Sequence, residues 1–90
     1  MKPSAPIVLL HGWGFTPAVW APLLDALTSL GIDRDQIPTP ALPLHTTGLH
    51  NSQQALLDQL PPAAHLVGWS LGGELALSLA LAAPERLASL

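Results

Sequence analysis

The chain has 90 residues, of which 49% are hydrophobic and 10% charged, and its formal net charge is −3. The negative charge and the lack of a basic cluster argue against nucleic acid or an anionic membrane as a partner. Zero cysteines exclude disulfides and thiolate metal sites, so we expect a protein of the reducing cytoplasm with no metal and no cofactor.

The first expected element is a strand at residues 6–10, with a glycine-rich loop directly after it. Pro6-Ile7-Val8-Leu9-Leu10 is a short apolar run, which is typical of a strand buried on both faces. The first five residues lead straight into it, so we expect no secretory signal. The loop His11-Gly12-Trp13-Gly14 can turn a backbone N–H into a cleft at the end of this strand.

Two side chains of this loop have alternative interpretations. His11 either packs and hydrogen-bonds under the loop or transfers a proton during catalysis. Trp13 either walls an acyl pocket or only packs against its neighbours.

A helix is expected over residues 17–30. Thr16 suits the N-cap and Pro17 the first helical position. Apolar residues then recur at helical spacing up to Gly31. Among them, Trp20 is expected in the core.

A short second strand is expected at residues 35–39 and a helix over residues 51–60. The helix begins at Asn51 or Ser52 and is stopped by Pro61, because proline cannot continue it. Four acidic residues are interpreted as solvated surface: Asp25, Asp33, Asp35 and Asp58.

A strand at residues 64–69 and a helix over residues 71–83 flank the most informative motif, Gly68-Trp69-Ser70-Leu71-Gly72. Strand, sharp turn and helix are the context in which a G-x-S-x-G sequence forms a nucleophile elbow. The glycines remove Cβ atoms that would collide with nearby backbone, and the serine sits in a strained conformation with its Oγ in a cleft. Ser70 is therefore the predicted nucleophile. In the alternative interpretation it only caps the helix.

An oxyanion hole needs two donors, one after the nucleophile and one from an earlier loop. The Leu71 N–H is the natural first donor and the Trp13 N–H the natural second. Glu74, one turn into the helix, either favours its amino-terminal end or faces the cleft. The expected supporting residues are His11, Gly12, Gly68 and Gly72.

These motifs resemble those of α/β-hydrolases of the esterase type. The likeness rests on Leu9–Gly14, Val19-Trp20, Gly68–Gly73 and Pro84-Glu85-Arg86. Within that superfamily, the pairing of the two glycine motifs is most similar to the pimeloyl-[acyl-carrier protein] methyl ester esterases of biotin synthesis. The resemblance implies an α/β fold, a parallel sheet of about three strands with flanking helices. Residues 1–90 would form the N-terminal, truncated part of one hydrolase domain.

The resemblance also implies a catalytic acid and a histidine later in the chain than Ser70. No histidine follows Ser70 in this sequence. His65 lies at the wrong end of the elbow strand, and His45 and His50 fall in a loop that could at best reach the cleft mouth. We therefore expect residues 1–90 alone to be nearly inactive.

The expected function is hydrolysis of a carboxylic ester through an acyl-enzyme. The implied substrate is a small ester, such as a pimeloyl chain carried on acyl-carrier protein. Residues 39–45 depart from the family's pattern, because they lack its acidic residue and glycines, and this leaves substrate preference open. The alternative is a non-catalytic fragment or interaction module that binds a partner through an unsatisfied sheet edge.

Overall fold

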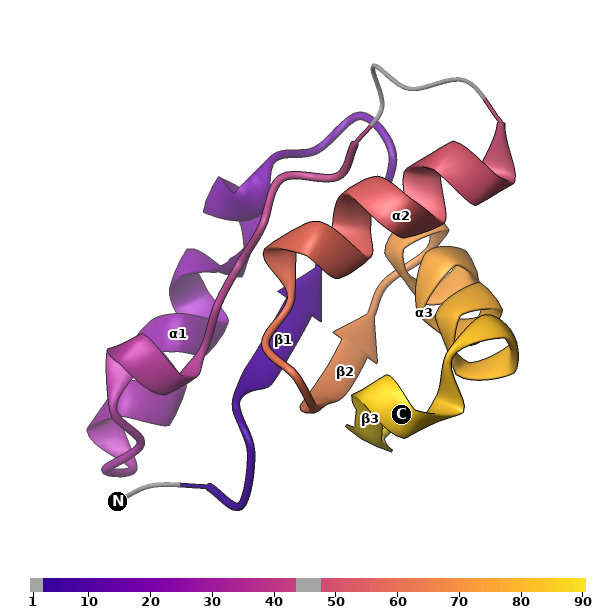
Figure 1. The fold of residues 1–90 in the computed structure, drawn as a ribbon. Helices are drawn as coiled ribbons and strands as arrows, with labels where there is room; N and C mark the ends of the chain where they lie inside the picture. Colours follow the sequence, from indigo (N-terminus) through magenta and orange to yellow (C-terminus); the bar gives the residue numbers. More distant parts are fainter. Residues whose placement is uncertain (1–2, 44–47) are drawn as a thin grey trace.

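The computed structural model describes residues 3–43 and 48–90, which form a three-stranded parallel sheet flanked by helices (Figure 1). The strands, in spatial order, are β1 (Ile7–Leu10), β2 (Ala64–Gly68) and β3 (Leu87–Ser89). The helices are α1 (Ala21–Ser29), α2 (Leu49–Gln59) and α3 (Leu71–Ala82), with 3₁₀ turns at Pro17–Trp20, Arg34–Gln36 and Pro84–Arg86. The predicted α/β architecture with parallel strands is confirmed.

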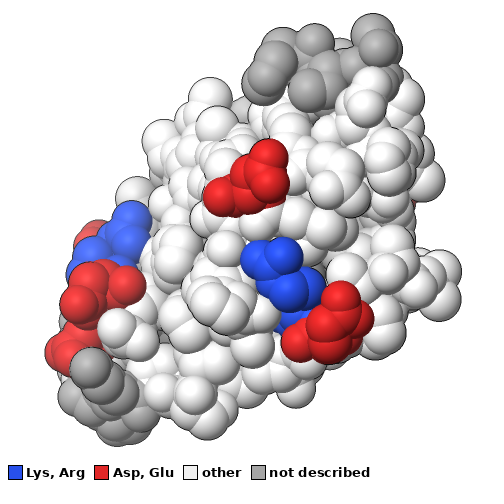
Figure 2. Space-filling model, in the orientation of Figure 1, with Lys and Arg blue, Asp and Glu red and all other residues white. Residues whose placement is uncertain are grey.

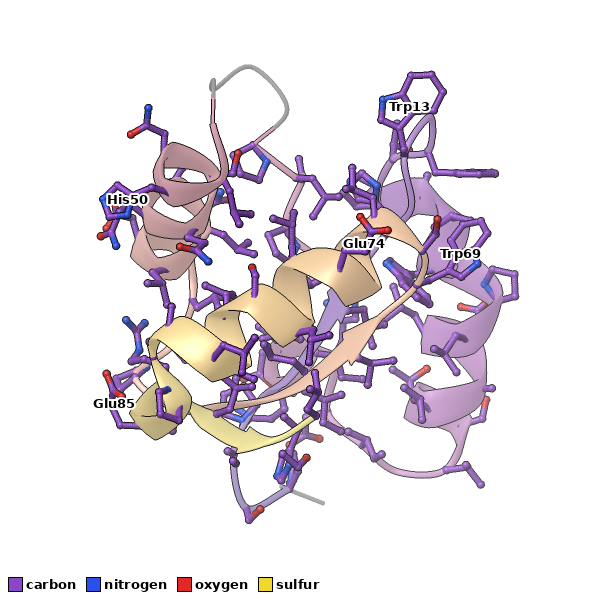
Figure 3. The ribbon with its side chains drawn as sticks, turned by 90° about the vertical axis from the view of Figure 1, so that its right-hand side faces the viewer. Trp13, His50, Trp69, Glu74 and Glu85 are labelled. Carbon is purple, nitrogen blue, oxygen red and sulfur yellow. The ribbon has the colours of Figure 1, made fainter. Side chains whose placement is uncertain are left out.

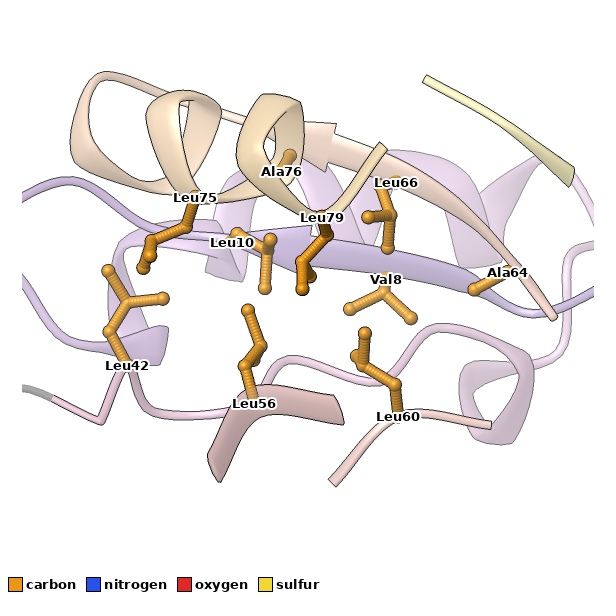
Figure 4. Packing of buried hydrophobic residues seen from close by; sticks show 10 residues of the cluster. All are labelled: Val8, Leu10, Leu42, Leu56, Leu60, Ala64, Leu66, Leu75, Ala76 and Leu79. Carbon is orange, nitrogen blue, oxygen red and sulfur yellow. The ribbon is translucent and has the colours of Figure 1, made fainter. Parts of the chain in front are cut away.

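The main core lies between one face of the sheet and the helices α2 and α3 (Figure 4). Val8 and Leu10 of β1 point into it, because alternate residues of a strand share a face. They meet Leu56 of α2 and Leu79 of α3, and all four side chains are fully buried. Leu9 points to the opposite face of the sheet, since side chains alternate along a strand, and it too is buried.

The strands expected at residues 6–10 and 64–69 and the helix expected over 71–83 are confirmed to within one residue at each end. The helix expected over 17–30 begins instead as a 3₁₀ turn and continues as α1. Thr16 caps this turn as predicted, since its Oγ1 accepts a hydrogen bond from the Ala18 N–H (3.3 Å). Trp20 is half-buried, and its buried Nε1 has no partner among the residues that the structure describes.

The predicted strand at residues 35–39 is wrong. Residues 34–36 form a 3₁₀ turn, and the segment after it runs beside β1 without pairing as a strand. One backbone hydrogen bond joins them, from the Leu9 N–H to the Pro38 carbonyl oxygen (3.0 Å). Pro38 and Pro40 have no N–H to donate, so this segment cannot complete a ladder.

Arg86 ties the turn before β3 to the end of α2. Its guanidinium donates to four backbone carbonyl oxygens at 3.0–3.2 Å, those of Leu57, Leu60, Pro61 and Pro62. The last carbonyls of a helix lack intrahelical partners and favour a cation. Arg86 therefore satisfies the end of α2 and fixes where β3 enters the sheet beside β2.

Charged side chains are sparse on the surface. Figure 2 shows them scattered over the face drawn, with no continuous basic area. Of the described cations, Arg34 and Arg86 both donate to backbone carbonyls. Within residues 3–43 and 48–90, no helix is long and apolar enough to cross a membrane.

Replacing Arg86 with alanine should lower the free energy of unfolding by about 2 kcal/mol, because four carbonyl oxygens lose a charged donor. Urea unfolding of the full polypeptide measures this loss of stability. The matched control is Glu85→Ala at the exposed neighbouring position, which should change stability by no more than about 0.5 kcal/mol. Equal effects of the two substitutions would contradict the role given to Arg86.

Candidate active site

Ser70 lies at the sharp turn between β2 and α3, and its backbone is strained. Its φ of 56° and ψ of −117° make it the one non-glycine residue with positive φ in the described part of the chain. Such a conformation costs about 1–3 kcal/mol and persists where surrounding contacts impose it. Ser70 occupies the N-cap position of α3, yet its side chain makes no capping hydrogen bond. The hydroxyl is exposed and makes no hydrogen bond to any residue that the structure describes.

Gly68 and Gly72 allow this turn, because backbone atoms of neighbouring residues occupy the space where their side chains would lie. A Cβ on Gly68 would lie 2.5 Å from the Cα of Gly73. A Cβ on Gly72 would overlap the carbonyl oxygen of Leu10 and lie 2.7 Å from that of His11. Real Cβ atoms do not approach backbone so closely, so α3 can begin here only with glycine at both positions.

The same contacts bring the two sequence motifs together. The Trp69 N–H donates to the Leu10 carbonyl oxygen (3.0 Å), which joins the end of β1 to the elbow. A Cβ on Gly12 would lie 3.2 Å from the Trp69 ring and 3.4 Å from the Cβ of Ser70. The loop after β1 therefore runs directly beside the predicted nucleophile, as an oxyanion hole requires.

The two predicted oxyanion donors are both unoccupied. Neither the Trp13 N–H nor the Leu71 N–H donates a hydrogen bond to a residue within 3–43 or 48–90. Leu71 is the first residue of α3, where the helix has a partial positive charge. Convergence of these two N–H groups on one oxygen beside Ser70 stays a prediction.

His11 lies under the loop and is only 2% exposed. Its Nδ1–H donates to the Gly12 carbonyl oxygen (2.8 Å), and its Nε2 accepts a hydrogen bond from the Leu42 N–H (3.2 Å). These two bonds assign the neutral tautomer with the proton on Nδ1, and they use both ring nitrogens. This environment favours the packing interpretation of His11 over proton transfer.

Aromatic side chains surround the elbow. The rings of Phe15 and Trp69 lie with centroids 4.7 Å apart at a tilt of 53°. Trp13 is 74% exposed, so it projects outward and packs little against the described residues (Figure 3). Sequence reasoning missed Phe15, and the signal for it was an aromatic residue one position after the glycine loop.

None of the described histidines is hydrogen-bonded to Ser70, and both ring nitrogens of His11 are bonded to backbone groups. His65, near the start of β2, is hydrogen-bonded to Ser4 and Ser89. His50 is exposed at the start of α2, on the opposite side of the molecule from Trp69 in Figure 3. His45 falls outside the described residues.

Glu74 lies in the first turn of α3, near the elbow in Figure 3. It is exposed, and its backbone N–H donates to the Ser70 carbonyl oxygen (3.0 Å). It also lines an open, mostly apolar cavity of about 320 Å³ bounded by residues of α3 and the first residue of α2. The other lining residues are Leu49, Leu71, Leu75, Leu77, Ser78 and Leu81. A carboxylate in the first turn favours the positive end of the helix, in agreement with the first interpretation of Glu74.

Comparison with known proteins identifies the family of the chain. Residues 7–89 match the protein family described as the alpha/beta hydrolase family. A pimeloyl-[acyl-carrier protein] methyl ester esterase of Aromatoleum aromaticum is 43% identical, over 93% of this chain and 34% of its own length. An esterase of the same name from Aeromonas hydrophila is 42% identical, over 93% of this chain and 35% of its own.

A biotin biosynthesis bifunctional protein of Cellvibrio japonicus is 40% identical, over 90% of this chain and 17% of its own length. The chain thus spans about a third of the length of the two esterases. All three alignments cover most of this chain, so they include both glycine motifs of the site.

Replacing Gly72 with alanine should lower the free energy of unfolding by about 3 kcal/mol, because the added methyl group pushes α3 away from the end of β1. Urea unfolding measures the loss. Gly73→Ala is the matched control, since a Cβ there would meet nothing closer than the Gly68 carbonyl oxygen at 3.3 Å. Its cost should be offset by the higher helix propensity of alanine, leaving a change within about 1 kcal/mol. Two equal losses would show that the contact with β1 does not control this position.

Proposed function

The chain belongs to the alpha/beta hydrolase family, and from that premise we propose that it is the nucleophile-bearing part of a serine esterase. The observation that carries the proposal is Ser70 itself, strained, exposed and unbonded at the start of α3. Backbone strain at a non-glycine residue is retained where function needs it. A simple helix cap would use its hydroxyl as an acceptor, and Ser70 does not.

In the proposed reaction, Ser70 Oγ attacks the ester carbonyl carbon, and the carbonyl oxygen becomes an oxyanion. The N–H groups of Trp13 and Leu71 hold that oxygen. The alcohol leaves, and water then hydrolyses the acyl group from Ser70. The base that takes the serine proton, and the carboxylate that orients it, come from a part of the hydrolase fold beyond these residues.

The proposed substrate is a methyl ester of a pimeloyl chain carried on acyl-carrier protein, or a similar small ester. The names of the related esterases support this choice. The exposed aromatic rings of Trp13, Phe15 and Trp69 support it as well, since they offer an apolar surface to an aliphatic acyl chain beside Ser70. The proposed location is the cytoplasm, in keeping with the absence of cysteine.

A second candidate function is a non-catalytic interaction module. One side of β3 is unpaired in the three-stranded sheet, and such an edge can accept another strand. This function gives no reason for the strain at Ser70 or for the close approach of Gly12 to it. The esterase proposal explains both features.

A fluorophosphonate probe should label Ser70 in the full polypeptide. Ser70→Ala should abolish labelling and lower kcat for a small methyl ester by on the order of 10⁴- to 10⁶-fold, as in other serine hydrolases. Ser29→Ala, which removes an exposed serine at the end of α1, should leave both unchanged. Undiminished hydrolysis by Ser70→Ala would refute the proposal. Residues 1–90 expressed alone should label poorly, because no histidine in 3–43 or 48–90 is hydrogen-bonded to Ser70 to serve as its base.

A further inference from the structure

A second serine–histidine arrangement lies at the other end of the sheet from Ser70. His65 belongs to β2, and its ring is hydrogen-bonded on both nitrogens, to Ser4 Oγ through Nε2 (2.8 Å) and to Ser89 Oγ through Nδ1 (2.6 Å). Five residues separate it from Ser70 along an extended strand, or roughly 16 Å. The esterase mechanism proposed above uses none of these three side chains.

The cluster is assembled by strand pairing. Ile7 of β1 and Ser89 of β3 are both in register with His65, so the imidazole lies between its two neighbouring strands. The backbone N–H of His65 also donates to the Pro6 carbonyl oxygen (2.9 Å), which holds the segment carrying Ser4 against β2. His65 is half-buried, and both serines are exposed, so a small molecule can reach the hydroxyls.

A hydroxyl, a base and a group that orients the base are the three parts of an activated nucleophile, each within hydrogen-bond reach of the next. Ser89 suits the orienting role, because its backbone is fixed by pairing with β2. If the Nδ1–H donates to Ser89, the lone pair of Nε2 is free to accept from the Ser4 hydroxyl. Ser4 belongs to the irregular segment before β1.

The geometry points to Ser4 as a second nucleophile, for which His65 is the general base, and to activated aryl esters as the class of substrate. Ser4 Oγ bonds to the carbonyl carbon while its proton passes to His65 Nε2. The bond from that carbon to the aryl oxygen then breaks, and the phenol leaves with the proton from His65. The product is an ester of Ser4.

The restriction to activated esters follows from the surroundings of Ser4. No helix begins in the segment that carries it, in the part of the chain the structure describes. Ser4 therefore lacks the helix start that favours an oxyanion at Ser70. An aryl ester reacts without such help because its leaving group is stable. The alkyl ester formed on Ser4 is less reactive and should accumulate.

The test uses p-nitrophenyl acetate on the Ser70→Ala variant of the full polypeptide, so that failure of the proposed esterase function does not affect the result. Peptide mass spectrometry should find one acetyl group on Ser4 that alkaline hydroxylamine removes. Acetyl groups on Lys2 or the N-terminal amine resist this treatment, which separates them. His65→Gln should slow acetylation of Ser4 by about a hundredfold, because an amide can bridge the two hydroxyls but cannot take a proton.

Two controls keep the result specific. His50→Gln removes an exposed histidine of α2 and should leave the rate at Ser4 unchanged. Thermal unfolding of His65→Gln should match that of the parent, which shows that the sheet is intact. An acetyl group on Ser89 in place of Ser4, no hydroxylamine-sensitive acetyl group, or equal rates with histidine and glutamine at position 65 would each overturn the proposal.

Discussion

The contact between the start of α3 and the end of β1 is the constraint on which the rest of the site depends. The Leu10 carbonyl oxygen accepts the Trp69 N–H and lies against Gly72. Because no side chain separates them, the helix begins as close to the strand as backbone atoms allow. The chain must then reverse its direction within Trp69 and Ser70, and the positive φ of Ser70 follows from that geometry. Ser70 is exposed at the turn that results.

The core provides the free energy that holds this strained turn. Ser70 costs about 1–3 kcal/mol in its conformation. Each fully buried leucine contributes about 1.5–3 kcal/mol, and Leu79 of α3 packs with Leu10 and Leu56 in the cluster beneath the helix. Two such side chains are enough to offset the strain. The distal turns of α3 therefore stabilise a conformation that the residues of the turn would not adopt on their own.

The elements marked by local sequence patterns were predicted correctly. The prediction was wrong for a segment whose structure depends on which backbone groups can form hydrogen bonds. The run before His11 and the elbow motif located β1, β2 and α3 to within one residue. Residues 35–39 contain an apolar position suited to a strand, but Pro38 within them and Pro40 just after them have no N–H to donate to a ladder. The position of Phe15 next to the glycine loop was the only sequence signal for it, and its contact with Trp69 joins segments that are distant in sequence.

The environment of His65 is a second case in which contacts between distant segments could not be predicted from local sequence patterns. Its position on the strand was correctly placed away from Ser70, but its two serine partners come from opposite ends of the chain and meet only through sheet register. The elbow, by contrast, is formed by contacts among residues 8–79, with no contribution from a base. The shape of the elbow therefore depends on contacts within the described residues, and substitutions at Gly68 or Gly72 are expected to act on folding. The conformation of Ser70, the proposed nucleophile, is thus set by backbone packing at the elbow rather than by a hydrogen bond to a histidine.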